Sequence, residues 1–367
     1  MPVDARRTPS SLFSASRPTF RVDGTLETHL NTALVDLLVE ETSQGLYRCE
    51  VRFGNWGPGA NGLDFLFFDA EIVDFGKAFA VDIGEPRAAE PIFNGRIMGI
   101  EAQYPDGQPP QIVILAEDRF QDLRMTRHTR SFNNVSIGDV VQEIATDHGL
   151  EANIALVENE PVRETLAQLN RSDLAFLREL ATAVDAETWV EEETLYFQAR
   201  AIRNAEKVSL SYGKNLREFT VLADLAHQRS SVGISGWDVA GKEPIYEEAD
   251  KQSIAAELNG LLSGSDVLDQ ALGPRNERIV LPGASNREEA SLQARVEYRR
   301  RARRFVCGSG LADGLAKLRV GSHVELTGPG SYFDGTYYAH LVRHAYDAVA
   351  GYRTFFEVHR PGIGKPS

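Results

Sequence analysis

The chain has 367 residues, of which 42% are hydrophobic and 25% charged, an ordinary globular composition with enough length for two to four domains. Its formal net charge of −14 disfavours specific nucleic-acid binding, because domains that wrap duplexes are usually basic. No stretch approaches the ~18 consecutive apolar residues that a membrane-spanning helix needs.

The N-terminal segment 1–19 is dominated by Arg, Ser, Thr and Pro and lacks the apolar centre of a secretory signal. We expect a flexible leader rather than a transit peptide, because an apolar pattern follows it directly. The two cysteines, Cys49 and Cys307, are too few for a disulfide framework or a cysteine metal site. They are predicted to be buried, reduced thiols.

Between 20 and 119, apolar runs alternate with clusters of Gly and Pro, which predicts strands and turns. A helix is predicted to start at Ser136, with Asp139 near capping-box spacing, and to stop at Gly149. A second helix has Ser172 as its expected N-cap. It is followed by "ETWVEEETLYFQAR", which predicts two strands joined by a Glu-rich turn.

The β pattern returns over 208–237 and again over 305–360. Between these segments, a helical insert is predicted over roughly 242–281. A longer helix is expected to begin at Ser285, which forms a capping box with Glu288.

One internal repeat links distant parts of the chain. "FNGRIMGIEAQYPDGQPPQIVILAEDR" (93–119) and "FDGTYYAHLVRHAYDAVAGYRTFFEVHR" (333–360) each open with Phe, Asn or Asp, and Gly. Each continues as strand, turn and strand and ends in Arg. The repeat is marked by Phe93, Gly95, Phe333, Gly335, Gly351 and Tyr352. It predicts two related antiparallel β-barrels within an α+β, mainly β chain.

Several motifs contain residue types that are typical of catalytic or metal sites. Glu191, Glu192 and Glu193 suggest paired carboxylates for glycoside hydrolysis, but they fall at a predicted hairpin tip, where a solvated turn is favoured. His340 and His344 have the spacing of a helical zinc pair. On the predicted strand they lie on one face, about 13 Å apart, which is too far to share one ion.

The basic run "EYRRRARRF" suggests a phosphate-binding helix. Small or aromatic residues recur every fourth position on that helix, at Ala290, Ala294, Tyr298 and Ala302. A solvated or subunit-facing basic edge on the opposite face is therefore favoured, formed by Arg299, Arg300, Arg303 and Arg304. The clusters "GNWGPGANG", "GSGLADG" and "GPGSYFDG" lack the features of phosphate or dinucleotide loops and are predicted to be turns.

Four stretches stand out in chain order: "SFNNVSIGDVVQEIATDHGL", "NRSDLAFLRELATAVDAETWVEEETLYF", "VGISGWDVAGKEPI" and the closing segment from "LRVGSHVELTGPG" to "FEVHR". Together they resemble the hub proteins of contractile tails, the phage late control D family related to the hub part of type VI spikes. The family-motif positions are Asp173, Phe176, Leu177, Trp237 and Asp238. The resemblance spans about 20–360.

The resemblance implies a domain plan. A flexible leader (1–19) precedes a first tube-like barrel (20–120) and an α/β module (121–206). A second barrel is split (207–240 and 303–362) around a helical insert (241–302), and a short tail (363–367) follows.

The resemblance also implies a structural role without catalysis, cofactor or metal. A homotrimer would adapt the hexameric tail tube to a trimeric spike and line the channel, in a tail baseplate assembled in the bacterial cytoplasm. Implied partners are tube protein, baseplate wedge proteins and tape-measure protein, without specific nucleic-acid binding. Because the chain ends soon after Arg360, a separate spike protein is expected. A tail-associated cell-wall hydrolase and a carbohydrate- or receptor-binding tail module are the alternatives.

Overall fold

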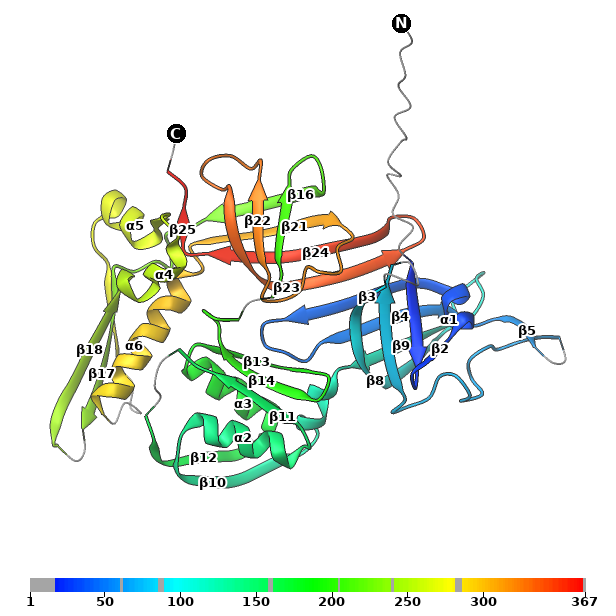
Figure 1. Cartoon of the computed structure of the whole chain (residues 1–367), viewed down its shortest axis with the longest axis horizontal. Helices are drawn as coiled ribbons and strands as arrows, with labels where there is room; N and C mark the ends of the chain where they lie inside the picture. The colour runs from blue at the N-terminus through cyan, green and yellow to red at the C-terminus, as the bar shows by residue number, and fades with distance from the viewer. Residues whose placement is uncertain are drawn as a thin grey trace, which may run out of the picture.

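The computed structural model describes residues 17–59, 62–84, 89–157, 161–203, 205–238, 241–280 and 286–365. Residues 1–16, most of the predicted leader, lie outside this range. The predicted mainly β class is confirmed, because one 13-stranded sheet dominates the molecule and the helices are few (Figure 1).

The large sheet contains two units of six strands each. The first unit consists of β1 (Pro18–Val22), β3 (Leu34–Thr42), β4 (Arg48–Gly54), β7 (Ala78–Ile83), β8 (Glu90–Gln103) and β9 (Gln111–Glu117). The second consists of β15 (Lys207–Ser211), β16 (Leu216–Ala223), β21 (Val306–Asp313), β22 (His323–Thr327), β23 (Gly335–Asp347) and β24 (Gly351–Arg360). The first unit also contains four short elements, β2 (Thr25–Leu26), α1 (Thr28–Ala33), β5 (Gly57–Gly59) and β6 (Gly62–Asp64).

The two units have the same topology. Their spatial orders are β3-β4-β9-β8-β7-β1 and β16-β21-β24-β23-β22-β15, so strands of equal rank along the chain occupy equal places. The units differ at one edge, where β1 pairs antiparallel with β7 but β15 pairs parallel with β22. Each unit buries its own apolar core.

Two β-bulges recur at equal places in both units. In β3 and β16, the ladder shifts after Leu34 and after Leu216. In the hairpins, it shifts after Ile97 in β8 and after Ala339 in β23. A bulge fixes the direction and register of its strand. The shared bulges therefore identify the units as two copies of one architecture, residue by residue.

The bulges correct the predicted alignment of the repeat. By register, Phe93 corresponds to Gly335, not to Phe333. The Phe-Asn-Gly motif lies inside β8, where a Cβ on Gly95 would come within 2.2 Å of the Glu117 carbonyl oxygen. The Phe-Asp-Gly motif is instead the turn that leads into β23. The similar letters therefore serve different structural purposes in the two hairpins.

The units are joined edge to edge. β23 pairs antiparallel with β3, from Leu341 opposite Thr42 to Asp347 opposite Asp36. Among the described residues, no ladder joins β1 to β3, and β15 meets β16 only through the isolated bridge of Tyr212 and Leu216. The edge of β3 is therefore not covered by closure of the first unit on itself. The partner unit covers it.

The α/β module lies between the units in the chain and below them in Figure 1. Its elements are η1 (Arg119–Leu123), β10 (Arg127–Val135), α2 (Ile137–Asp147), β11 (Glu151–Ala155), β12 (Arg163–Ser172), α3 (Asp173–Ala183), β13 (Ala186–Glu191) and β14 (Thr194–Ala199). The predicted capping box of Ser136 and Asp139 and the Ser172 N-cap are both present. These local signals place α2 and α3, whose apolar faces share one core.

The insert contains β17 (Ser231–Asp238), β18 (Glu243–Asp250), η2 (Lys251–Ile254), α4 (Ala255–Leu258), β19 (Leu262–Ser263), α5 (Gly264–Leu272), β20 (Asn276–Val280) and α6 (Arg287–Ala302). The insert, predicted to be helical, contains helices α4, α5 and α6 but also a three-stranded sheet of β17, β18 and β20. The prediction of the strand at 231–238 as part of the second barrel is corrected too, because β17 pairs within the insert. β25 (Gly362–Ile363) pairs with β19 and ties the C-terminal strand to the insert.

The start of α6 differs from the prediction by one residue. Asn286 is the N-cap and accepts a hydrogen bond from the Glu289 backbone N–H. Ser285, the predicted cap, lies outside the described residues. The predicted apolar face is correct, since Ala290, Ala294 and Tyr298 are buried in the core of the insert.

The "GSGLADG" cluster is a strand, not the predicted turn. A Cβ on Gly310 would lie 2.5 Å from the Phe356 ring, and one on Gly308 would lie 2.8 Å from the Phe219 ring. Glycines inside a strand allow such close approach of neighbouring groups. They make room for aromatic rings of the second unit.

We expect Gly310→Val to lower the free energy of unfolding by about 1–3 kcal/mol, because the new side chain overpacks against Phe356. Ser309→Val is the matched control, since Ser309 is the adjacent half-buried residue of β21 and its side chain points to the other face. Chemical denaturation of both variants tests this. Equal losses would contradict the steric explanation.

Candidate assembly surface

Charged side chains stabilise the contact between the two units, where β3 pairs with β23. Glu41 of β3 is only 1% exposed, and its carboxylate accepts hydrogen bonds from Arg319 Nε and, at 3.1 Å, from the Val320 backbone N–H. Arg343 Nε of β23 donates to Glu40 of β3 at 2.6 Å. A buried carboxylate must be paired to be tolerated. Glu41 therefore fixes the second unit against the first.

A second buried cluster joins the α/β module to both units. The Glu187 carboxylate of β13 accepts from Arg203 at 2.8 Å and from the Tyr338 hydroxyl of the second unit at 2.6 Å. Arg203 also donates to the Tyr47 hydroxyl at 2.9 Å, beside the first unit, and lies 3.7 Å over the Trp189 ring. One ion pair thus contacts the α/β module and both six-strand units.

The end of α6 corrects the prediction of a solvated or subunit-facing basic edge at Arg303. Arg303 is 2% exposed and binds the carboxylates of Asp185, next to β13, and Glu257 of α4. Burial opposes ionisation of Glu257, but the hydrogen bonds and charge of Arg303 outweigh it and lower the pKa of that carboxyl. Arg303 therefore ties the insert to the α/β module, while Arg300 stays exposed and pairs with Glu297.

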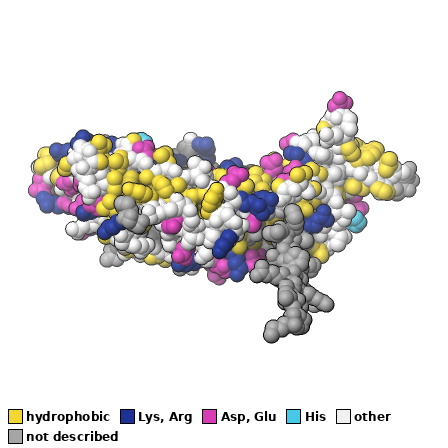
Figure 2. All heavy atoms as spheres, turned by 90° about the horizontal axis from the view of Figure 1, so that it is seen from above, with side chains coloured by type: hydrophobic (Ala, Val, Ile, Leu, Met, Phe, Trp, Pro, Cys, Tyr) yellow, Lys and Arg dark blue, Asp and Glu magenta, His cyan; other side chains and the backbone are white. Residues whose placement is uncertain are grey.

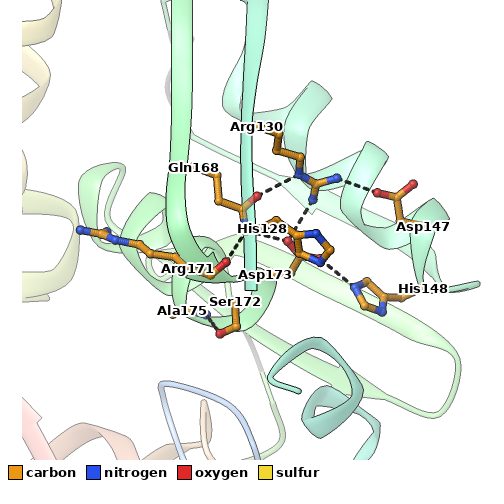
Figure 3. A network of polar contacts seen from close by, with 9 residues as sticks. All are labelled: His128, Arg130, Asp147, His148, Gln168, Arg171, Ser172, Asp173 and Ala175. Carbon is orange, nitrogen blue, oxygen red and sulfur yellow. Dashed lines mark hydrogen bonds and ion pairs between the residues drawn. The ribbon is translucent and has the colours of Figure 1, made fainter. Parts of the chain in front are cut away.

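Asp173, the first residue of α3, is the centre of a polar network in the α/β module (Figure 3). It is 2% exposed and accepts from Gln168 at 2.8 Å and from Arg130 at 2.9 Å, and it lies 2.9 Å from His148 Nε2. Burial opposes its ionisation, but these partners outweigh burial and lower its pKa. The network holds the antiparallel pair β10 and β12 against both helices.

This network has an Asp–His pair but no activated nucleophile. A hydrolase would need a hydroxyl or thiol within hydrogen-bond reach of the imidazole. The neighbouring Ser172 hydroxyl instead accepts from the Ala175 backbone N–H at 3.3 Å, as a helix cap. The arrangement is suited to holding the strands and helices of the module together rather than to acyl transfer.

The remaining predicted motif residues are not brought together in one place. Phe176 and Leu177 are buried in the module core. Trp237 is 54% exposed at the end of β17, where the Asp238 carboxylate accepts from the Gly241 backbone N–H at 2.8 Å. Phe176 and Leu177 therefore belong to the α/β module, whereas Trp237 and Asp238 belong to the insert.

The repeat markers form local structure within the units. Phe93 is buried in the first core, and Phe333 packs against the second. Gly351 has φ +68° in the hairpin turn, a conformation that favours glycine. The next residue, Tyr352, has its hydroxyl 2.8 Å from His344 Nδ1.

The Glu-rich segment is a turn, as predicted. Glu191 ends β13 and Glu192 has φ +52° at the tip. Glu193 lies 3.5 Å from Arg119, with its side chain 84% exposed. Three exposed carboxylates at a hairpin tip offer no enclosed site for an acid–base pair.

The two histidines of β23 do not share a face, contrary to prediction. The bulge lies at His340, which stacks on His359, with ring centroids 4.6 Å apart, outside the core. His344 points into the protein and is fully buried. The extra residue reverses the alternation of side chains between the two positions. Within the described ranges, no group of three or more His, Cys, Asp or Glu could hold a metal ion.

An open hollow of about 910 Å³, which the sequence did not reveal, lies between the second unit and the helices α3 and α6. Its lining includes Arg200, Cys307, His340 and His359. Burial lowers the pKa of His340 to about 4, so the imidazole is neutral at pH 7. Burial also raises the pKa of Cys307, which disfavours the reactive thiolate. Cys307 is half-buried rather than fully buried as predicted, and both cysteines are free.

Exposed aromatic side chains gather at one end of the first unit. Phe65 lies 5.2 Å from Trp56, 5.0 Å from Phe68 and 6.3 Å from Tyr104, measured between ring centroids. All four are at least 38% exposed. Figure 2 shows hydrophobic side chains at this end of the molecule, which carries β5 and β6. We call these four residues the aromatic patch. Such patches mark interaction surfaces.

The architecture is shared with solved tail proteins. The crystal structure of the 43 kDa tail protein of prophage MuSo2 from Shewanella oneidensis gives a TM-score of 0.70 at 16% identity, covering 95% of this chain and 99% of that chain. The tail protein from Neisseria meningitidis MC58 gives 0.68 at 12% identity, covering 96% and 98%. The chain therefore has the fold of phage-tail-type proteins.

Two further comparisons extend this result. The E. coli c3393 protein, described as a type VI secretion component similar to the T4 tail proteins gp27 and gp5, gives a TM-score of 0.60 at 12% identity over 95% of this chain and 79% of that chain.

No curated protein matches the chain by sequence. The family model described as the Alg8 N-terminal domain matches residues 59–347, and the chain belongs to that family. None of the helices in the described part is long and apolar enough to cross a membrane.

We expect Arg303→Met to destabilise the protein by about 3–5 kcal/mol, because it leaves two carboxylates in the interior without their cation. Arg300→Met is the matched control on the same helix, where loss of an exposed pair costs about 0–1 kcal/mol. Urea unfolding of both variants measures the difference. Similar losses would show that Arg303 has no special role in joining the insert to the module.

We expect Asp173→Asn to cost about 1.5–3 kcal/mol at pH 7, because the charged hydrogen-bond acceptor is lost. Since the folded-state pKa of Asp173 is lowered, its contribution is present above the unfolded pKa of about 3.9 and is lost as pH falls through the folded value. The stability difference between wild type and variant should therefore shrink below about pH 4. Unfolding curves between pH 3 and 7 provide the test, and a constant difference would contradict it.

Proposed function

We propose that the protein is the baseplate hub of a contractile phage tail or a phage-tail-like injection system, of the late control D type. Three chains form a ring that adapts the hexameric tail tube to a separate trimeric spike. The role is structural rather than catalytic. The partners are the tube protein, the spike, baseplate wedge proteins and the tape-measure protein, at the tail baseplate of a particle assembled in the bacterial cytoplasm.

The duplicated six-strand unit is the observation that carries this proposal. Two copies of one architecture in each chain allow three chains to present six similar seats. The shared bulges make the copies equivalent in register as well as in strand order. A hexameric tube requires such a surface, whereas a hydrolase or an isolated binding module does not.

The sheet face that points away from the two cores is suited to line the channel where α3 and α6 do not cover it. Glu50, Glu101 and Glu218 are exposed there. Like charge keeps passing DNA from adhering. Together with the net charge of −14, this supports passage of cargo without specific nucleic-acid binding. A reconstruction of the assembled particle with these carboxylates on the outside of the ring would contradict this lining.

Native mass spectrometry and negative-stain imaging test the proposal directly. We expect a mass of three chains and ring-shaped particles, because the architecture offers two equivalent units per chain. Binding to purified tube protein should follow. A stable monomer would contradict the hub role, and robust peptidoglycan turnover or glycan binding by that monomer would favour one of the two alternatives.

A further inference from the structure

We propose that the free half of β8 in one copy of the chain pairs antiparallel with β16 of a second copy. The contact repeats, between molecules, the β3–β23 joint that each chain contains internally. The inference rests on the proposed ring of identical chains, and it names the two strands that join them and the register.

Each chain contains one pairing between its two units, that of β3 with β23. The equivalent edges of β8 and β16 lack such a partner within the described residues. β23 pairs with β22 through Gly335–Tyr338 and, beyond its bulge, with β3 through 341–347. Its counterpart β8 pairs with β7 through 90–96, but beyond its bulge the described residues offer it only β9. Within the described ranges, β16, the counterpart of β3, forms a ladder only with β21, apart from the isolated bridge of Leu216 with Tyr212. An unpaired edge is a template for another strand.

The two open edges are complementary in position. β8 lies in the first unit and β16 in the second, so a contact between them is head-to-tail and can repeat around a ring. Aligning the bulges transfers the internal register to the intermolecular contact. The expected opposing pairs are Gly99–Asp224, Ile100–Ala223, Glu101–Leu222, Ala102–Val221, Gln103–Thr220, Tyr104–Phe219 and Pro105–Glu218.

Exposure of the counterparts supports this occupant. Tyr346 on β23 is 9% exposed, because it is buried in the core of the other unit opposite Leu37. Its counterpart Tyr104 is 64% exposed at the aromatic patch. In the proposed register, Tyr104 meets Phe219 of the second copy, and aromatic cross-strand pairs stabilise sheets.

The edge strand β16 has an apolar side chain at a position where β3 has a charged one. Leu222 of β16 is 62% exposed, and it stands at the place that Glu40 occupies on β3. Glu40 forms an ion pair with Arg343 inside the chain. In the proposed register Leu222 stands opposite Glu101, so the contact between copies has no counterpart of that ion pair. We therefore expect the contact between copies to tolerate salt.

Disulfide trapping tests the register. Gln103→Cys and Thr220→Cys are introduced together in the full chain, with Cys307→Ser to remove the half-buried native thiol. Directly opposite residues have Cβ atoms about 4.5–5.5 Å apart, within reach of a bridge after small adjustment. Mild oxidation should give a covalent trimer on a non-reducing gel. The internal counterpart, Leu38→Cys with Ala345→Cys, should close within one chain and stay at monomer mass.

A pair shifted by two residues checks specificity. Gln103→Cys with Leu222→Cys places the Cβ atoms about 7–8 Å apart, so the covalent trimer should fall several-fold. The proposal is overturned if native mass shows a trimer and the internal pair closes, yet Gln103→Cys/Thr220→Cys stays uncrosslinked. In that case the hub role stands. A wild-type monomer overturns both.

A charge substitution gives a second readout that does not depend on thiols. We expect Tyr104→Asp to shift native mass from trimer to monomer while the circular dichroism spectrum is unchanged. Leu169→Asp is the control, because Leu169 is 65% exposed on β12 of the α/β module. A Tyr104→Asp protein that remains trimeric at micromolar concentration contradicts the proposed contact.

Discussion

The ladder between β3 and β23 is the constraint on which the rest of the structure depends. It turns two six-strand units into one continuous sheet and removes an exposed edge that would otherwise attract other strands. Because backbone pairing fixes register, the relative position of the units is set to within one residue. A slip by one position would turn Glu41 away from Arg319 and place every side chain of β3 on the wrong face.

Buried charge pairs, rather than one shared apolar core, connect the other parts to this sheet. Each part has a core of its own, although Leu292 and Val296 of α6 also pack in the core of the α/β module, and Glu187 and Arg303 lie where parts meet. Such pairs gain little net stability, because desolvation offsets their attraction, but an incorrect arrangement leaves a charge unpaired at high cost. They therefore act chiefly on specificity, by allowing one docking geometry for the α/β module and the insert. Asp173 has the same effect inside the module, where it orients the paired strands β10 and β12 over two helices.

Local signals in the sequence were sufficient for the features that depend on neighbouring residues. The caps at Ser136 and Ser172, the Glu-rich turn and the mainly β class follow from short-range hydrogen bonding and periodicity. Features that depend on distant pairing were missed or misplaced. The bulge at His340 adds one residue to the strand, which the period-2 pattern of the sequence does not reveal. The predicted face of that histidine was therefore wrong. Arg303 resembles a surface cation until its distant carboxylates are known, and the aromatic patch is spread between Trp56 and Tyr104 in the sequence.

The distribution of repeated and unrepeated parts bears on symmetry. The six-strand unit occurs twice in the chain, whereas the α/β module and the insert each occur once. In the proposed trimer, the repeated strands give six equivalent positions and the unrepeated parts give three. Figure 1 shows the unrepeated parts gathered below and beside the joined sheet rather than interrupting it. One surface of a ring can then follow sixfold symmetry while another follows threefold symmetry, because the insert leaves from the β16–β21 connection, where the first unit has only the short β3–β4 turn.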